Sequence, residues 1–381
     1  MKPVIEDKHI VVITQVNPYT PVGGVTVVLK NLFSTYSNDS YTFAYLGRFS
    51  KKLNKEAELK TDIYRLIPNF HIIQLLGYFF PKLKRLFAIR RGVKLVKQRK
   101  AHCIVGLYPT LNSLEVSVEV AKRTGVPYYP YLHDTVKEGL AHLQFAERGA
   151  AVQEEVFKTA KKIITMSEGM SDFYEKEYNG LVTYPLEHSF PETLAEEPNF
   201  NRNKDGFWGG EVYKINDQSF ARVQNALLEE NTQFTVTSLS KLTINKTSNV
   251  FQTFFPSRAE YLEAVKEHGV LVLSINWPDE TDVDIAELST IFPTKTIEYL
   301  ATGSPILVHC PEDYFLAKFF RKHQCGVVVS ERDTDLLREA IQKLQSKDEE
   351  VHEMQRKALA ATQLFSIENI QKKFEDILLR D

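Results

Sequence analysis

A lysine and a glutamate stand three residues apart in the stretch Pro293-Thr-Lys-Thr-Ile-Glu-Tyr-Leu-Ala-Thr-Gly-Ser-Pro-Ile-Leu-Val308. Pro293 suits a first helical turn and Gly303 suits the residue just past a helix end, so the stretch predicts a short helix. Lys295 and Glu298 then share one face near the helix N-terminus, where backbone N–H groups and the helix dipole attract phosphate. A plain surface ion pair between the two side chains explains the spacing equally well.

Further candidates stand where an apolar, strand-like run gives way to a helical pattern. Gly23 and Gly24 let backbone N–H groups approach a phosphate or a sugar, although a tight turn is the simpler interpretation. His133 and Asp134 end a strand-like run, where a partly buried histidine is the ordinary alternative. Ser167 holds an equivalent position, and a helix N-cap is enough to explain it.

Short apolar runs alternate with amphipathic stretches along the whole chain, which predicts parallel β/α units. A polar, proline-rich stretch over residues 184–198 separates two such series, and we expect the hinge between two domains there. Parallel α/β domains bind ligands at the carboxyl ends of their strands. The expected strands lie near residues 10–16, 42–47, 102–108, 127–132, 161–166, 206–209, 233–238, 270–275, 305–309 and 326–330.

The composition excludes several classes of protein. The 381 residues are 43% hydrophobic and 25% charged, with a formal net charge of −2, so no global basic character marks a nucleic-acid binder. Three widely spaced cysteines fit neither a disulfide framework nor a metal cluster, which favours a reducing compartment. The N-terminus shows no signal peptide, and the apolar run 70–80 covers only half of the roughly 20 residues that a spanning helix needs.

A strongly basic stretch follows this apolar run. Residues 82–100 contain nine Lys or Arg among 19 positions and no acid, and the apolar side chains fall near one helical side. A solvated helix packed on the first domain would show the same pattern. The single sign of the charge favours contact with an anionic membrane surface over a nucleic-acid groove.

Taken in this order, these elements resemble the GT-B glycosyltransferases, in particular the bacterial retaining enzymes of glycosyltransferase family 4. The resemblance covers essentially the whole chain, and its most specific part is the stretch 293–308. It implies an α/β protein of two doubly wound Rossmann-like domains facing a cleft. By position, Glu298 would hold the ribose of a nucleotide sugar, Gly24 would approach the diphosphate or the sugar, and His133 would lie beside the sugar's reacting face.

The chain departs from the family pattern in the second domain. Many relatives carry two glutamates eight positions apart, and the position eight before Glu298 is Thr290. Relatives also often carry an arginine and a lysine in the first loop of this domain, where the chain has Lys214 but no arginine. Lys295 or Lys214, with backbone amides, must then neutralise the diphosphate.

An acidic run over residues 278–284 contains an Asp-x-Asp triplet. Such a triplet alone is weak evidence for a metal-binding site, and GT-B enzymes generally need no protein-bound metal. We therefore expect a solvated loop here, with no metal site and no cofactor.

These arguments give a definite set of expectations. The domains are 1–190, on which a C-terminal helix at about 364–381 packs back, and 191–363, which binds the nucleotide sugar. Candidate catalytic residues are His133 and Asp134. Candidate donor-binding residues are Gly23, Gly24, Ser167, Lys214, Thr294, Lys295 and Glu298. Candidate membrane-contact residues are Lys84, Arg85, Arg90, Arg91 and Lys94.

The expected activity is transfer of a sugar from a nucleotide-diphosphate donor to an acceptor hydroxyl, with retention of anomeric configuration. The expected acceptor is a lipid-linked glycan, met by a cytoplasmic protein bound peripherally at the inner face of the cell membrane. One alternative is a catalytically silent GT-B subunit that binds nucleotide or glycan and supports an active partner, which the two departures favour. A sugar-nucleotide epimerase is another.

Overall fold

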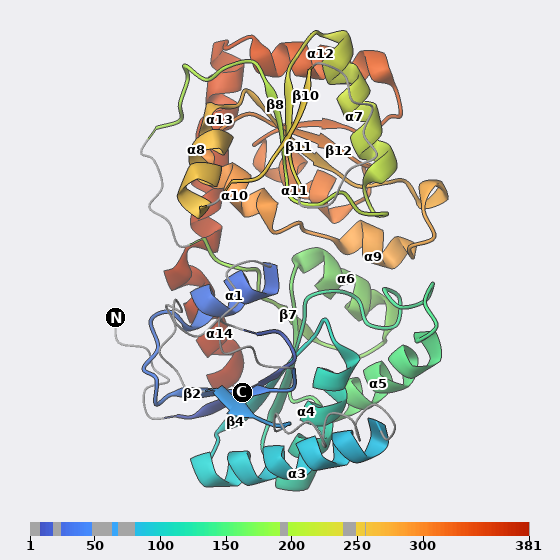
Figure 1. Ribbon diagram of the computed structural model, residues 1–381, viewed down its shortest axis with the longest axis vertical. Coiled ribbons are helices and arrows are strands. Elements are labelled where there is room, and N and C mark those ends of the chain that lie inside the picture. Colours follow the sequence, from blue (N-terminus) through green and yellow to red (C-terminus); the bar gives the residue numbers. More distant parts are fainter. Residues whose placement is uncertain are drawn as a thin grey trace. The chain divides into compact units, whose positions relative to one another are not determined.

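The computed structural model describes residues 8–17, 24–47, 63–67, 81–190, 197–238, 249–255 and 257–380. Within these ranges the chain forms two compact α/β units (Figure 1). Unit 1 comprises Met1–Ser189 and Ile367–Asp381, and unit 2 comprises Phe190–Ser366. The chain therefore passes between the units twice.

Unit 1 contains a parallel sheet of seven strands in the order β3-β2-β1-β4-β5-β6-β7. β1 pairs with β2 on one side and with β4 on the other, so the strand order reverses at β1. In open α/β sheets this reversal opens a crevice at the carboxyl ends of the two strands, here β1 and β4. The strands are β1 (Ile10–Thr14), β2 (Tyr41–Tyr45), β3 (Ile63–Arg65), β4 (Cys103–Leu107), β5 (Tyr128–Leu132), β6 (Ile163–Thr165) and β7 (Thr183–Pro185).

Unit 2 repeats this plan with six parallel strands in the order β10-β9-β8-β11-β12-β13. Its order reverses between β8 and β11, which pair directly. The ligand-binding edge of unit 2 is therefore expected at the carboxyl ends of these two strands. The strands are β8 (Gly206–Gly209), β9 (Phe234–Thr237), β10 (Val250–Thr253), β11 (Val270–Ser274), β12 (Ile306–His309) and β13 (Val327–Val329).

Helices connect the strands in both units (Figure 1). Those of unit 1 are α1 (Gly24–Phe33), α3 (Pro81–Arg99), α4 (Leu111–Thr124), α5 (Ala146–Thr159), α6 (Glu168–Glu177) and α14 (Ile367–Leu379). Those of unit 2 are α7 (Asp217–Glu229), α8 (Arg258–Glu267), α9 (Ile285–Thr290), α10 (Lys295–Thr302), α11 (Phe315–His323), α12 (Thr334–Gln345) and α13 (Glu349–Thr362), with 3₁₀ turns η2 (Pro278–Glu280) and η3 (Gln363–Phe365).

The last helix, α14, belongs to unit 1, although the whole of unit 2 precedes it in the chain. Its apolar side chains Ile370, Phe374, Ile377 and Leu378 are buried in the core of unit 1. Figure 1 shows α14, drawn in dark red, beside α1, drawn in blue, and the two helices are in contact. Burial of this apolar face holds the C-terminus on the first unit.

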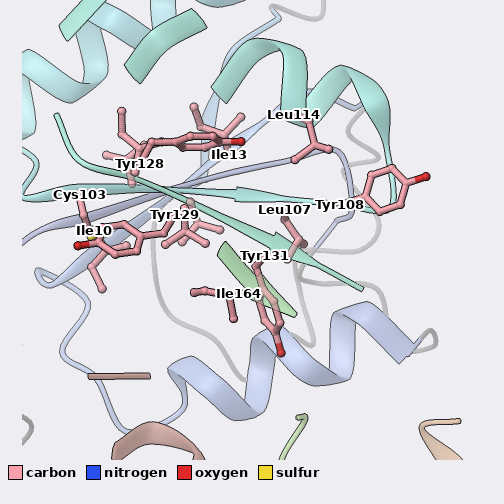
Figure 2. Packing of buried hydrophobic residues seen from close by; sticks show 14 of the residues in the cluster. Ile10, Ile13, Cys103, Leu107, Tyr108, Leu114, Tyr128, Tyr129, Tyr131 and Ile164 are labelled. Atoms are coloured by element: carbon pink, nitrogen blue, oxygen red, sulfur yellow. The ribbon is translucent and has the colours of Figure 1, made fainter. Parts of the chain in front are cut away.

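Strand β5 shows how the core of unit 1 is assembled. Tyr128 projects to one face of the sheet, and Tyr129 and Tyr131 project to the other (Figure 2). The Tyr128 hydroxyl lies 2.9 Å from Ser117 Oγ on α4, and the Tyr129 hydroxyl donates to the Leu378 carbonyl on α14 at 3.1 Å. Each buried phenol thus finds a polar partner, as burial of a hydroxyl requires.

The prediction of two parallel α/β units is confirmed, and three strands were missed by the sequence patterns. These are β3, β7 and β10, each of three or four residues. All three lie at sheet edges. An edge strand is covered less completely, so it carries no long apolar run by which it could be recognised.

The predicted apolar side of the basic helix is partly wrong. On α3, Leu83 and Phe87 are 55% and 37% exposed, whereas Ala88, Ile89, Leu95 and Val96 are buried. No helix within the described ranges is long and apolar enough to span a membrane, and the apolar run 70–80 lies outside those ranges.

Candidate functional site

The helix predicted from Pro293 to Gly303 is present as α10. It begins at Lys295 and ends before Gly303, whose φ of 61° is the left-handed conformation that glycine adopts without strain. The Pro293 carbonyl accepts from the Thr296 N–H at 2.8 Å and fixes the first turn. Ile297, Leu300 and the other apolar residues of α10 are buried, which orients the helix on the sheet of unit 2.

Lys295 turns away from solvent onto an aromatic ring. Its Nζ lies 3.0 Å from the centroid of the Trp208 ring, and Trp208 is fully buried in β8. Burial lowers the pKa of Lys295 well below its usual range, and the charge of Glu298 offsets only part of this effect. Lys295 forms no ion pair with any described residue. A bound anion would therefore favour protonation of Lys295 and would not compete with a carboxylate for its ammonium group.

Glu298 is held by two other residues. Its Oε1 lies 2.7 Å from Arg258 Nη1, and its Oε2 accepts from the Tyr261 hydroxyl at 3.2 Å. The side chain is 18% exposed. The simple interpretation of Lys295 and Glu298 as a surface ion pair is therefore wrong. An ionised carboxylate accepts about four hydrogen bonds, so Glu298 retains capacity for hydroxyl donors such as those of a ribose.

Gly209 and Gly210 form the turn at the carboxyl end of β8. The Gly209 N–H donates to the Tyr299 hydroxyl of α10 at 2.7 Å, and the Gly210 N–H donates to Thr237 Oγ1 at 2.9 Å. A Cβ on Gly209 would lie 2.3 Å from the Tyr261 hydroxyl oxygen. Gly209 therefore allows Tyr261 to approach closely enough to hold Glu298.

Gly209→Ala tests this arrangement. The added methyl group must displace Tyr261, which removes one of the two hydrogen-bond donors to Glu298. We expect weaker binding of nucleotide diphosphates by about 1 kcal/mol, measured by isothermal titration calorimetry. Tyr261→Phe in the same background relieves the closest contact, and it should recover part of the lost folding stability. Unchanged affinity in Gly209→Ala would contradict a role for this turn.

The N-terminus of α7, another place for a phosphate, is already occupied by a side chain. Asn276 Oδ1 accepts from the Gln218 and Ser219 N–H groups at 3.1 and 2.9 Å, and its Nδ2 donates to the Lys214 carbonyl at 2.9 Å. Thr296 of α10 differs, because its hydroxyl is buried and has no hydrogen-bond partner within the described residues. The start of α10 is therefore the better phosphate site in unit 2.

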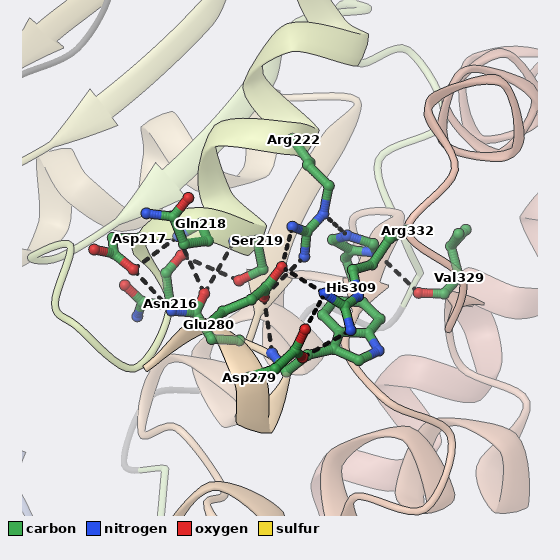
Figure 3. Close-up of polar contacts among 12 residues, drawn as sticks. Asn216, Asp217, Gln218, Ser219, Arg222, Asp279, Glu280, His309, Val329 and Arg332 are labelled. Atoms are coloured by element: carbon green, nitrogen blue, oxygen red, sulfur yellow. Dashed lines mark hydrogen bonds and ion pairs between the residues drawn. The ribbon is translucent and has the colours of Figure 1, made fainter. Parts of the chain in front are cut away.

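The acidic run 278–284 is exposed or partly exposed throughout, as expected, but it begins with the 3₁₀ turn η2 and most of its acids are paired. Its carboxylates bind neighbouring cations (Figure 3). Asp279 accepts from Arg332 through two hydrogen bonds of 2.7 and 2.8 Å, and Glu280 accepts from Arg222 Nη2 at 3.2 Å. Glu280 also accepts from the Trp277 N–H at 2.9 Å, which fixes the turn after β11. No three His, Cys, Asp or Glu side chains of the described chain converge as metal ligands.

His309, at the end of β12, completes this network (Figure 3). Its Nε2 accepts from Arg222 Nε at 3.1 Å, so Nδ1 carries the proton and donates to the Val329 carbonyl at 3.0 Å. Burial lowers the pKa of His309 to about 4. The network is thus satisfied by its own members, and its role is to position the loops after β8 and β11.

Within the described chain, the other predicted residues of unit 2 form no hydrogen bond or ion pair with Lys295 or Glu298. Lys214 Nζ is 3.0 Å from Asp282 Oδ2, and both side chains are exposed. Thr294 is exposed at the start of α10, and its side chain makes no capping hydrogen bond. The Thr290 hydroxyl donates to the Ala286 carbonyl at 2.8 Å within α9, so it does not take the place of the family's first glutamate.

In unit 1 the predicted residues lie at the carboxyl edge of the sheet. Gly24 begins α1, and Gly23 lies outside the described residues. Asp134 is exposed directly after β5. The predicted helix N-cap at Ser167 is confirmed, because its hydroxyl accepts from the Met170 N–H of α6 at 3.1 Å.

His133 is buried beside Tyr131, with ring centroids 4.4 Å apart. Its Nε2 is buried and has no hydrogen-bond partner within the described ranges. Burial, and secondarily the charge of His188, lowers the pKa of His133 from 6.5 to about 3. The imidazole is therefore neutral at neutral pH.

This shift predicts a dependence of stability on pH. From pH 6.5 down to about 3 the unfolded chain binds a proton at His133 that the folded chain does not bind. The free energy of unfolding should therefore fall on acidification, by up to about 1.4 kcal/mol per pH unit from this group. In urea titrations between neutral and acidic pH, His133→Phe should show a shallower fall than the unaltered protein. Parallel profiles would contradict the assignment.

Several residues of the site escaped the sequence analysis. These are Trp208, Gly209, Arg258, Tyr261 and Tyr299. A glycine pair directly after an apolar strand, Gly209-Gly210, was the available signal, since the same pattern had drawn attention to Gly23-Gly24. Arg258 and Tyr261 carried no comparable signal, because only the fold brings α8 beside α10.

The sequence matches no family profile and no curated protein. Solved structures do match. Anabaena Alr3699/HepE, in complex with UDP and glucose, is 13% identical, with a TM-score of 0.70 over 98% of this chain and 100% of that chain. Sucrose-phosphate synthase from Thermosynechococcus elongatus is 14% identical, with a TM-score of 0.67 over 97% of this chain and 98% of that chain.

A third match is WaaG, a glycosyltransferase involved in lipopolysaccharide biosynthesis. It is 14% identical, with a TM-score of 0.61 over 98% of this chain and 100% of that chain. At such identities the likeness shows the fold alone. The two Rossmann-like units thus match those of GT-B glycosyltransferase structures, and the chain has the GT-B fold.

Proposed function

We propose that the protein is a glycosyltransferase that takes a sugar from a nucleotide-diphosphate donor and passes it to an acceptor hydroxyl. The observation that carries the proposal is the pair Lys295 and Glu298 on α10. A lysine amine that packs on Trp208, with no carboxylate partner among the described residues, stands one helical turn from a carboxylate with unused acceptor capacity. The structural neighbour HepE was solved in complex with UDP-glucose, a ligand that carries both a diphosphate and a ribose.

Each residue has a definite role in this proposal. Lys295, the Thr296 hydroxyl and the N-terminus of α10 bind the diphosphate and neutralise the charge that develops as it leaves. Glu298 accepts hydrogen bonds from the ribose hydroxyls, while Arg258 and Tyr261 fix its orientation. In unit 1, His133, which is neutral at neutral pH, and the adjacent Asp134 are the proposed catalytic residues. The reaction retains anomeric configuration and uses no protein-bound metal.

The proposed acceptor is a lipid-linked glycan, reached from the membrane surface through α3. One exposed stripe of this helix carries Leu83 and Phe87, followed by Arg90, Lys94 and Lys97. Exposed apolar side chains beside cations suit the interface of an anionic bilayer. Of the other predicted contacts, Arg85 Nη1 pairs with Glu115, which leaves its other donors unused within the described residues, and Arg91 Nε donates to the Arg65 carbonyl at 3.1 Å.

Arg90→Gln with Lys94→Gln tests the membrane contact. Each cation near an anionic surface contributes about 1 kcal/mol, so the double variant should bind anionic liposomes about 25-fold more weakly in a flotation assay. Lys176→Gln with Lys372→Gln removes the same charge from exposed sites on α6 and α14 and serves as the control. Equal losses in both variants would contradict a specific contact through α3.

A transfer assay separates the proposed activity from its alternatives. The purified protein is incubated with UDP-, GDP-, TDP-, ADP- and CMP-sugars, with and without a membrane lipid extract. A glycosyltransferase labels the extract and releases nucleotide. A silent subunit releases no nucleotide from any donor, and an epimerase converts the donor without an acceptor and without net hydrolysis.

A further inference from the structure

A groove of about 490 Å³ lies between α3, α4 and α5 of unit 1. These three helices are neighbours in Figure 1, and α4 contacts both of the others. Leu86, Ile89, Val118, Ala151 and Val152 give the groove an apolar lining. The groove is also lined by four cations, Lys82, Arg85, Arg123 and Arg148, and by three acids, Glu115, Glu119 and Glu155, so its lining has one positive charge in excess. A cavity of this size suits a small ligand or a headgroup rather than a folded partner.

Glu115 of α4 organises two of the arginines. Its Oε1 lies 2.8 Å from Arg85 Nη1, and its two oxygens accept from Arg148 Nε and Nη2 at 2.9 and 2.6 Å. Burial alone would raise the pKa of Glu115, but the guanidinium groups of Arg148 and Arg85 hold it below its usual range. One ionised carboxylate thus fixes two guanidinium groups side by side and leaves one positive charge in excess.

The two guanidinium groups retain unused donors. A guanidinium carries five N–H donors, and both side chains are 41% exposed. Within the described residues Arg85 uses Nη1, and Arg148 uses Nε and Nη2. Arg85 Nε and Nη2 and Arg148 Nη1 therefore remain for a ligand. Arginine donors in a fixed geometry match the oxygen atoms of a phosphate.

Hydrogen bonds join this arginine pair to the ligand-binding edge of the sheet. Arg148 Nη2 donates to Asn112 Oδ1 at 2.8 Å, and Asn112 Nδ2 donates to Gln15 Oε1 at 3.2 Å. Gln15 directly follows β1, where the strand order of unit 1 reverses. A ligand held by the arginines would therefore lie near the carboxyl edge at which α/β sheets bind substrates.

We propose that this groove binds the phosphate headgroup of an anionic membrane lipid. The arginine pair accepts the phosphate oxygens, and the apolar lining covers the first methylene groups of the lipid. Leu83 and Phe87, exposed on the adjoining face of α3, place the groove beside a surface suited to a bilayer. The inference rests on the membrane contact in the proposed function, and it names the lipid chemistry that the contact recognises.

The test compares vesicles of equal surface charge. Phosphatidylcholine vesicles carry either phosphatidic acid or an anionic lipid with a carboxylate headgroup, adjusted to the same zeta potential. The full-length protein should bind the phosphate-containing vesicles at least about fivefold more tightly, the equivalent of about 1 kcal/mol. Ala151→Trp should abolish this preference, because a bulky side chain at this exposed position fills the groove without entering the core.

Ala141→Trp, at an exposed position outside the groove, is the matched control and should keep the preference. Binding to both vesicles without preference, or a preference that survives Ala151→Trp, would overturn the headgroup site while leaving the membrane contact intact. Binding of inorganic phosphate to the protein in solution, together with equal binding to both kinds of vesicle, would show a site for free phosphate and would also overturn it. Absence of binding to either anionic vesicle would instead contradict the membrane contact itself.

Discussion

Lys295→Met is expected to lower kcat/KM for the sugar donor by about 10²- to 10³-fold, the usual cost of removing one preorganised charge from a transition state. The reason is electrostatic. Lys295 packs on Trp208 and has no carboxylate partner in the described chain, so a bound diphosphate favours its protonation and receives its undivided charge. Methionine keeps the packing on the indole ring but removes the charge. Steady-state kinetics with the donor identified by the transfer assay provides the measurement.

Lys318→Met is the control for this substitution. Lys318 is exposed on α11 of the same unit, and its loss should leave kcat/KM unchanged. If Lys295→Met and Lys318→Met have equal activity, diphosphate neutralisation by Lys295 is wrong. The thermal midpoint of Lys295→Met should not fall, because methionine keeps the contact with Trp208 and removes a desolvated amine that has no ionic partner within the described residues.

Glu298→Gln is expected to weaken nucleotide binding by about 10- to 100-fold, since a hydrogen bond to a charged group contributes about 1.5–3 kcal/mol. Glutamine has the same shape, but it cannot offer a charged oxygen to the ribose hydroxyls. Isothermal titration calorimetry with the nucleoside diphosphate measures the change directly. Arg258 loses its ionic partner in this variant, but its side chain is 37% exposed and stays hydrated, so the fold is retained.

A deoxyribose nucleotide sharpens this prediction. If Glu298 binds the ribose hydroxyls, a 2′-deoxy nucleotide should already bind more weakly than the ribose nucleotide to the unaltered protein. Glu298→Gln should then weaken binding of the 2′-deoxy nucleotide less than it weakens binding of the ribose nucleotide. Glu263→Gln, at an exposed acid on α8, is the control. Equal losses for the ribose and deoxyribose ligands would assign Glu298 to some other part of the nucleotide.

The fold followed from the sequence wherever apolar runs were long and fully buried. β1, β4, β5 and β11 are each five residues with every position buried, and all four were predicted. The edge strands lacked this signal. The burial of α3 was also misjudged, because a helix with cations on most sides does not reveal from its sequence which apolar residues meet the neighbouring helix.

The candidate site was predictable only within α10. Lys295 and Glu298 lie on one short helix, and their spacing and its caps identified them. Their partners Trp208 and Arg258 are 87 and 40 residues earlier in the chain (295 − 208 and 298 − 258). Such contacts depend on how β8 and α8 pack against α10, and local sequence patterns do not predict this packing. For the same reason the sequence suggested an ion pair between Lys295 and Glu298, although each has another partner.

The most direct test of the central claim is a thermal-shift titration of the intact protein with UDP-, GDP-, TDP-, ADP- and CMP-sugars. A ligand that binds only the folded state stabilises it by about 2.7 kcal/mol at one hundred times its Kd. We predict that at least one nucleotide sugar raises Tm in proportion to the logarithm of its concentration, and that the variant with both Lys295→Met and Glu298→Gln loses this response. No shift with any donor, or the same shift in the double variant, would contradict a nucleotide-sugar site on α10.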